Sequence, residues 1–364
     1  NKYGDNSLKA LLVASFVLYC AVFCSSLLAE QVDDLYRGQV QVTNQTSMAQ
    51  QAGVRDALRQ VLVKLTGNSQ ILGTAKVDEL LTHVDDYVAA LGYTALSEST
   101  MPSNNANIGL DVNFSKAALD QFVRAQKLPV LPSNRPLVLI WMIGDDAQTG
   151  RRQFVNSLAT PKIADLVAEK LQQRGIPFVF PGFDLEDRIA LSEDEAWKMD
   201  ASAIAAASQR YQSDVWLLLR FYTTSSGEVR GSWLYQASGE RKLGDGRAAN
   251  IEDFVPSSLD HIVDGIAGYY AYVPQARHNQ FQVEVDGVTD YAGYRALKRQ
   301  VEQLELVENL QMISVEGSKL ALSVEVEGDI ELLYQALLRS GYLRAARPVQ
   351  AFDRGVLYLS WAAK

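Results

Sequence analysis

The sequence predicts a mixed α+β and α/β protein in which an N-terminal export signal precedes three small αβ modules. The prediction rests on an apolar leader, on apolar residues that alternate between strand-like and helix-like spacing, and on an ordinary globular composition of 48% hydrophobic and 21% charged residues. We expect residues 1–29 to be the signal, 30–132 the N-terminal module, 133–274 the middle module and 275–364 the C-terminal module.

The leader predicts export. Lys2 and Lys9 come before an unbroken apolar stretch at residues 10–29, and small residues lie near its end. This pattern is typical of a secretory signal peptide, so we expect a periplasmic protein. Two alternatives stay open. About 20 apolar residues also suffice for an uncleaved inner-membrane anchor, and Cys20 or Cys24 could carry a lipid, although a large residue precedes each.

The composition argues against cysteine chemistry and against nucleic-acid binding. Both cysteines lie in the leader, so a cleaved protein has no disulfide, no thiol nucleophile and no cysteine metal site. The net charge of −9 and the short basic clusters argue against nucleic-acid binding, which needs a concentrated basic surface. We therefore expect no cofactor and no nucleic acid. Association with the membrane is expected only if the leader is retained.

The N-terminal module begins with an alternating strand at residues 35–42. Thr46 or Ser47 caps a helix whose apolar stripe stops before Gly67, a residue typical of helix C-termini. The remaining elements expected are a short helix at 77–84, strands at 87–96 and 108–114, a helix at 115–127 and a Pro-punctuated linker at 128–136.

The middle module opens with the apolar run PLVLIWMIG at residues 136–144, which is typical of a buried strand. Thr160 and Pro161 then begin a helix that Gly175 ends. The elements expected after it are a strand at 176–180, an acidic loop at 181–188, a helix at 194–210, a buried strand at 214–222, an antiparallel strand at 228–236 and a helix opened by Pro256 and Ser257.

The C-terminal module has the clearest pattern. Apolar residues alternate at 281–285 and again at 320–326, and amphipathic helices follow both runs. With a strand near 310–315 and a last strand at 355–361, the order is β-α-β-β-α-β. That order predicts a ferredoxin-like sandwich.

Catalytic patterns are missing from the sequence. His83, His261 and His278 are isolated, and no metal-binding or serine-nucleophile motif occurs. The loop GDDAQTGRR after the first buried strand has neither the spacing nor the lysine of a phosphate-binding loop. These observations favour a protein that is not an enzyme.

Two sets of residues are candidate binding positions. Asp184, Glu186 and Asp187 lie in a polar loop after a strand, a common place for ligands or partners in αβ sheets, although such a loop also caps the next helix. Tyr269, Tyr270 and Tyr272 lie near a module boundary and form a candidate docking surface. Their alternative role is to seal the contact between the middle and C-terminal modules.

Five stretches carry a family resemblance: VDDLYRGQVQV, VLVKLTGN, PLVLIWM, FPGFDLEDR and RYQSDVWLLLR. Together they resemble a bacterial envelope family called domain of unknown function 2066, over essentially the whole mature chain. The resemblance implies a gammaproteobacterial exported protein and supplies no catalytic residues. More loosely, the middle module is similar to the amino-terminal domain of TolB and of lipoproteins that activate peptidoglycan synthases. The first module is similar to a domain of a flagellar accessory protein.

The favoured functional hypothesis is a noncatalytic periplasmic scaffold that docks on envelope proteins. The alternative is a receptor for a small molecule or glycan, with a pocket between modules near residues 184–187. A carboxylate-based hydrolase is a third possibility.

Overall fold

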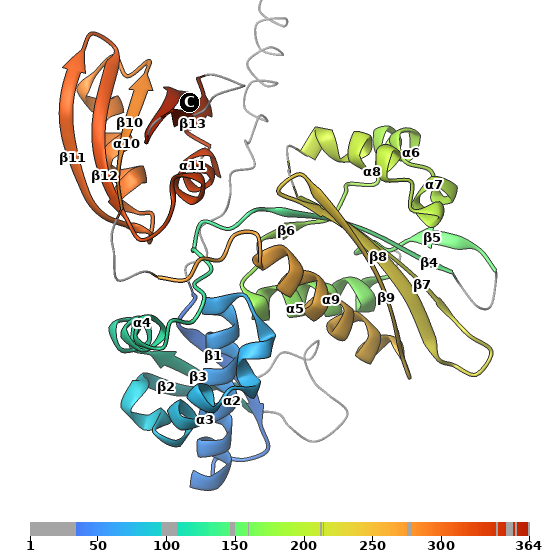
Figure 1. The fold of residues 1–364 in the computed structure, drawn as a ribbon. Coiled ribbons are helices and arrows are strands. Elements are labelled where there is room, and N and C mark those ends of the chain that lie inside the picture. Colours follow the sequence, from blue (N-terminus) through green and yellow to red (C-terminus); the bar gives the residue numbers. More distant parts are fainter. Residues whose placement is uncertain are drawn as a thin grey trace, which may run out of the picture.

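The computed structural model describes residues 34–95, 108–145, 150–158, 160–211, 213, 215–274, 279–339, 341–346, 352–353 and 355–362 (Figure 1). These residues form a mixed α+β fold with three sheets and ten α-helices, which confirms the predicted class. The predicted export signal, residues 1–29, lies outside this described part. Within it, no helix combines the length and the apolar character needed to cross a membrane.

The first unit, residues 34–127, is a three-stranded antiparallel sheet with helix α2 packed on it. Thr46 caps α2 by accepting the amide of Ala49, and Gly67 ends it with a left-handed φ of +68°. A Cβ on Gly38 of strand β1 would lie 2.6 Å from the carbonyl oxygen of Ala57, so glycine allows the sheet to approach the helix closely. The strand order is β1-β3-β2. The elements are β1 (Arg37–Val42), α2 (Ser47–Thr66), η1 (Ser69–Gly73), α3 (Ala75–Thr82), η2 (Val84–Tyr87), β2 (Val88–Ala95), β3 (Ile108–Phe114) and α4 (Lys116–Ala125).

The middle unit, residues 136–267, is a sheet of order β5-β4-β7-β8-β9, with the short β6 beside β4. Strands β4, β6 and β7 are parallel, whereas β8 and β9 continue the sheet as antiparallel hairpins. The strands are β4 (Val138–Asp145), β5 (Arg152–Phe154), β6 (Phe178–Val179), β7 (Val215–Thr223), β8 (Val229–Ala237) and β9 (Glu240–Ala248). The helices are α5 (Pro161–Arg174), α6 (Leu185–Ala190), α7 (Glu193–Lys198), α8 (Ala201–Ser208), η4 (Gln209–Tyr211) and α9 (Ile251–Ala267).

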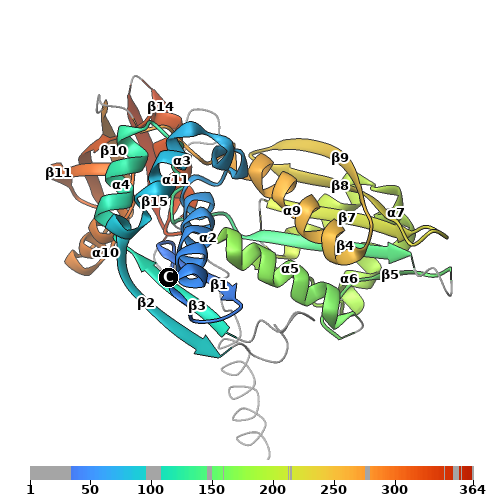
Figure 2. The ribbon, with the colours of Figure 1, turned by 90° about the horizontal axis from the view of Figure 1, so that it is seen from below.

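The two faces of the middle sheet are covered unequally. Helices α5 and α9 line one face, where they share a core with β4, β7 and β8 (Figure 2). Helices α6, α7 and α8 lie on the other face, where they contact β4, β5 and β7 (Figure 1). The second face of β8 and β9 therefore extends beyond the short helices.

Two predicted helices of the middle unit differ from the observed ones. The helix expected at 194–210 is broken into α7 and α8, because Met199 adopts a left-handed φ of 57° and Asp200 caps a new helix. Helix α9 begins at Ile251, capped by Asn250, and Pro256 lies inside it rather than at its start. In both places a polar capping residue determines where the helix begins, and the spacing of apolar residues does not reveal such a cap.

The last unit, residues 279–362, has the strand order β11-β12-β10-β15-β13. In the predicted ferredoxin-like fold, the last strand follows β12 through a helix and so runs parallel to β12. Because β12 is antiparallel to β10, that last strand should also be antiparallel to β10. Strand β15, which we expected to be that strand, is instead parallel to β10. The short β13 has the expected direction, and β15 is inserted between it and β10, so the ferredoxin-like prediction was incomplete. The elements are β10 (Asn279–Asp286), α10 (Tyr291–Glu302), β11 (Val307–Glu316), β12 (Lys319–Val326), α11 (Ile330–Arg339), β13 (Leu343–Ala345), β14 (Phe352–Asp353) and β15 (Val356–Trp361).

The Pro-punctuated segment at 128–136 is held by all three units. Leu131 donates its amide to Leu65 of α2, Ser133 donates to the carboxylate of Glu305 at 2.7 Å, and the amide group of Asn134 donates to Ala336 of α11. Arg135 is fully buried and donates to backbone carbonyls of the first and middle units. The predicted linker is therefore a packed junction.

Candidate functional site

The acidic residues at 184–187 form a closed ion cluster. Asp184 caps α6 by accepting the amide of Asp187 at 2.9 Å, and both carboxylates pair with Arg210 at 2.7 and 2.8 Å. Asp187, 1% exposed, also accepts the Phe183 amide and the Tyr211 hydroxyl. The hydrogen bond from Arg210 holds the pKa of Asp184 well below its ordinary value.

The rest of this cluster is consistent with a structural role. Burial, followed by the hydrogen bond to Asp187, raises the pKa of Tyr211 to about 12. Glu186 is mostly exposed and lies 3.5 Å from Arg210. Because Arg210 and backbone amides already bind the two aspartates, they anchor α6 to the end of α8 instead of presenting free carboxylates. The helix-capping interpretation describes these residues better than a ligand loop.

The three tyrosines separate into different environments. Tyr270 and Tyr272 are only 7% and 8% exposed and belong to the cores of the middle and last units. The guanidinium of Arg339, on α11, lies 4.9 Å from the Tyr270 ring centroid. Tyr269 is half-buried and donates its hydroxyl to Glu240. Tyr270 and Tyr272 thus seal the contact between units and do not form an exposed docking surface.

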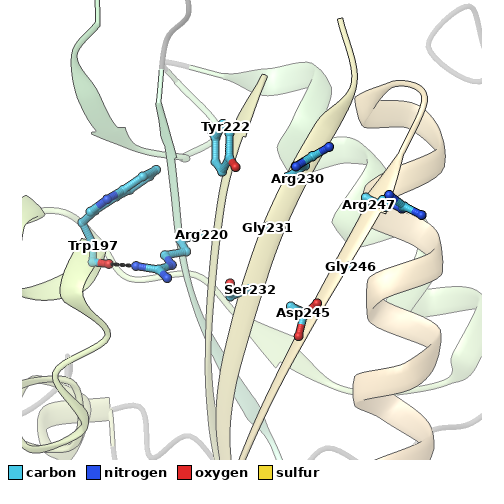
Figure 3. Close-up of a pocket in the computed structure, with 9 residues that line it drawn as sticks. All are labelled: Trp197, Arg220, Tyr222, Arg230, Gly231, Ser232, Asp245, Gly246 and Arg247. Atoms are coloured by element: carbon cyan, nitrogen blue, oxygen red, sulfur yellow. Dashed lines mark hydrogen bonds between the residues drawn. The ribbon is translucent and has the colours of Figure 1, made fainter. Parts of the chain in front are cut away.

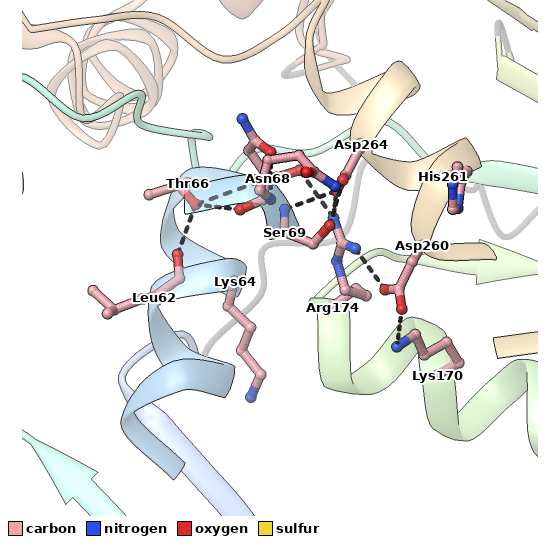
Figure 4. Close-up of polar contacts among 12 residues, drawn as sticks. Leu62, Lys64, Thr66, Asn68, Ser69, Lys170, Arg174, Asp260, His261 and Asp264 are labelled. Carbon is pink, nitrogen blue, oxygen red and sulfur yellow. Dashed lines mark hydrogen bonds and ion pairs between the residues drawn. The ribbon is translucent and has the colours of Figure 1, made fainter. Parts of the chain in front are cut away.

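A buried polar cluster joins the first unit to the middle one (Figure 4). Arg174, 3% exposed, pairs with Asp260 at 2.7 Å and with Asp264 at 2.5 Å. Asp264 also accepts the backbone amide and the hydroxyl of Ser69, which follows α2. Lys170 pairs with Asp260 at 2.6 Å. Both carboxylates of the cluster are ion-paired, and Asp264 reaches across to Ser69, so this cluster holds the two units together.

The middle sheet carries a groove of about 750 Å³ on the face that α6–α8 leave uncovered (Figure 3). Two rows of cross-strand neighbours build it. The lining residues are Trp197, Arg220, Tyr222, Arg230, Gly231, Ser232, Asp245, Gly246 and Arg247. In the first row Arg220 of β7 lies opposite Ser232 of β8, which lies opposite Asp245 of β9. In the second row Tyr222, Arg230 and Arg247 are neighbours in the same way.

Strand alternation explains why these side chains gather. Neighbouring residues of a strand point to opposite faces. Phe221 and Trp233 belong to the core that faces α9, so Arg220, Tyr222 and Ser232 point the other way. Apolar residues on one face and polar residues on the other are the pattern of a half-covered antiparallel sheet.

Trp197 of α7 forms one wall of the groove. The Arg220 guanidinium donates to the Trp197 carbonyl and lies 5.7 Å from its ring centroid, and Arg152 lies at 4.6 Å from the same ring. Arg220 is thereby oriented by the wall, whereas Arg230 pairs with Glu228, the residue that precedes β8.

Arg247 completes the groove's set of three arginines. In the part of the chain that the structure describes, the side chains of Arg247 and Asp245 make no hydrogen bond and no ion pair. The groove therefore presents a guanidinium without an internal partner, on the strand farthest from the Trp197 wall. Guanidinium groups pair well with carboxylates and phosphates.

Sequence reasoning did not identify this groove. Its residues come from three strands and one helix, and only the strand register brings them together. The available signal was the two-residue spacing of Arg220 and Tyr222 and of Asp245 and Arg247. In a strand this spacing places both residues of a pair on the same face.

The two histidines in the described part of the chain lie apart from the groove. His83 follows helix α3, and His261 on α9 contacts the carbonyl of Ser257 and the ring of Trp233. His278 lies outside the described residues. Among the residues described, no three or more His, Cys, Asp or Glu side chains gather as a group that could hold a metal ion.

Comparison with protein families corrects the resemblance proposed from sequence. Residues 29–132 match the family described as Domain of unknown function (DUF8605). This is a different family from domain of unknown function 2066, so that resemblance was wrong. Short alternating strands and amphipathic helices recur in many αβ modules, which is why the quoted stretches did not discriminate between families.

No curated protein matches the chain. Among solved structures, a competence-damaged protein (CinA) superfamily protein from Escherichia coli is similar at 15% identity and a TM-score of 0.21. The match covers 42% of this chain and 83% of that protein. At so low a TM-score the likeness carries no argument about fold or function.

Proposed function

We propose that this chain is a noncatalytic binding protein that holds an acidic segment of a partner protein in the arginine groove of its middle unit. The observation that carries the proposal is the half-covered face of β7, β8 and β9, which three arginines and Trp197 line together. Carboxylates are the protein groups that pair best with guanidinium ions, in bidentate geometry.

The arrangement of the groove suits an extended segment. Its two rows run across three strands, so successive side chains of a bound segment meet Arg220, Arg230 and Arg247 in turn. Trp197 and Tyr222 supply aromatic surface of the kind found at protein interfaces. Asp245 is available to accept a backbone amide of the segment and limits the net charge of the site.

The proposed place of action is the cell envelope, as expected from the leader. Residues 2–29 carry the export pattern that supports a periplasmic location, and the similarity of the middle unit to the TolB amino-terminal type belongs to the same proposal. Partners are accordingly envelope proteins with acidic exposed segments. The small-molecule alternative has less support, because Arg210 already binds the aspartates near which its pocket was expected.

The experiment is a titration of the full chain with a fluorescent oligo-glutamate peptide, followed by anisotropy, with oligo-glutamine as the neutral control. We expect Arg230→Ala and Arg247→Ala each to weaken binding about tenfold, a change of ~1.4 kcal/mol. The matched variant is Arg59→Ala, which removes an exposed, similarly ion-paired arginine from α2 and leaves binding unchanged.

Two results would overturn the proposal. One is an oligo-glutamate affinity no greater than that for oligo-glutamine. The other is an equal loss in all three arginine variants, which would mean that total charge, rather than the groove, attracts the peptide.

A further inference from the structure

Strand β9 is a long, regular edge of the middle sheet. All nine of its residues pair with β8 without a register shift, and it is the terminal strand of the sheet. Strand β11, which ends the last sheet, is also long, but it contains two register shifts. Bulges of that kind protect an edge against pairing with another chain, so β9 is the better template for strand addition.

The hairpin turn determines which residues face the free edge. Ser238 and Gly239 have φ of 51° and 79°, the positive values of a two-residue hairpin turn, so Ala237 and Glu240 form a hydrogen-bonded pair. Hydrogen-bonded and non-bonded pairs alternate along an antiparallel ladder. The N–H and C=O groups of Arg241, Leu243 and Asp245 therefore point away from β8.

The side chains of these residues are self-complementary. Arg241, Leu243 and Asp245 lie on the groove face, because Gly244 lies against Trp233 on the α9 face. Leu243 is 71% exposed. If two β9 strands pair antiparallel about a two-fold axis at Leu243, each Arg241 lies opposite an Asp245 and the two leucines are in contact.

Registers shifted to either side lack this pairing of Arg241 with Asp245. An axis at Gly244 places Arg241 opposite Arg247 and Leu243 opposite Asp245, and an axis at Lys242 places Arg241 opposite Leu243. Opposite charges across a strand pair stabilise it and like charges destabilise it. A two-fold axis also requires the same surface patch on both partners, which the sequence around Leu243 supplies.

We propose that two copies of this chain associate through β9, in antiparallel register centred on Leu243. The two middle sheets then form one continuous sheet, and the two arginine grooves lie on the same face of it. The inference rests on the edge of β9 and not on the occupant of the groove, with which it shares only Asp245.

The test is the mass of the full chain by sedimentation equilibrium across a concentration series, without ligand. We expect a monomer–dimer equilibrium for the natural chain. Arg241→Asp and Asp245→Arg each place like charges opposite one another twice in the dimer, so each raises the dissociation constant at least about tenfold. The double variant Arg241→Asp/Asp245→Arg restores the opposite pairs and the dimer.

Arg55→Asp is the matched control. It makes the same charge change as Arg241→Asp at an exposed position on α2 and leaves the dissociation constant unchanged. Circular dichroism establishes that every variant is folded. A natural chain that stays monomeric at all concentrations overturns the proposal. So does a dimer that tolerates both single reversals, or a double variant that fails to recover.

Discussion

Arg174 of α5 donates a hydrogen bond of 2.9 Å to the carbonyl oxygen of Gly67, the residue that ends α2. One side chain of the middle unit thus binds the C-terminus of the main helix of the first unit. A positive charge is favoured at a helix C-terminus, where unpaired carbonyls carry partial negative charge. Asp260 and Asp264 complete the partner set of the same guanidinium. The two units are therefore coupled through buried ionic contacts.

Arg174 and Asp264 are expected to be energetically coupled. A double-mutant cycle with Arg174→Met and Asp264→Asn should give an interaction free energy of about 1–3 kcal/mol, because the pair is mostly buried and hydrogen-bonded. Urea unfolding of the four chains measures it. Additive single effects would show that the pair contributes nothing beyond its separate contacts.

Arg135 should be among the least replaceable residues. It is fully buried and donates to the carbonyls of Lys64, Arg174 and Gly175, so Arg135→Met leaves buried acceptors unpaired and lowers the free energy of unfolding by about 3 kcal/mol or more. Arg135→Lys should not restore it, since an ammonium group lacks the planar fork. Chemical denaturation of both variants measures the loss, and a lysine variant as stable as the natural chain would contradict the reasoning.

Lys64 is expected to make the free energy of unfolding depend on pH. Burial lowers the pKa of Lys64 to about 8 in the folded chain, against 10.5 for an ordinary lysine. Between these values the unfolded chain holds a proton that the folded chain has released, so stability rises with pH across this window. Relative to a Lys64→Met variant, the natural chain should gain about 2 kcal/mol between about pH 7 and about pH 10.

The measurement is urea unfolding of both chains at several pH values in that window. Their difference isolates Lys64, because all other titrating groups are shared. Parallel curves for the two proteins would mean that Lys64 keeps its proton on folding.

Gly231 should not tolerate a side chain. A Cβ at this position would collide with the backbone oxygen of Arg220 and the ring of Phe254, so Gly231→Ala should destabilise the chain by about 1–3 kcal/mol. Gly73→Ala is the control, because nothing lies within 4 Å of its Cβ position. Thermal unfolding of the two variants compares them, and equal melting temperatures would contradict the expected collision.

The sequence predicted local structure better than it predicted the site. The stripe of α2 and its end at Gly67, the buried strand β4 and the alternation of β10 follow from short-range periodicity and end signals, which single segments carry. The insertion of β15 between β10 and β13 was missed because β13 has only three residues and its pairing is long-range.

The candidate site could not be predicted in the same way. Arg220, Arg230 and Arg247 are separated along the chain and become neighbours only through the register of two hairpins. The acidic residues at 184 and 187 had a visible pattern, but their partner Arg210 lies beyond a break between two helices that periodicity alone did not reveal.

The junction at residues 128–136 has a practical consequence for dissecting the molecule. The family match ends at residue 132, and proline-rich composition makes that position attractive for truncation. A fragment ending there would lack Arg135 and would leave the carbonyl of Lys64 without its guanidinium partner. Limited proteolysis should therefore spare this segment, and a shortened chain that behaves poorly would report a removed junction rather than an unstable first unit.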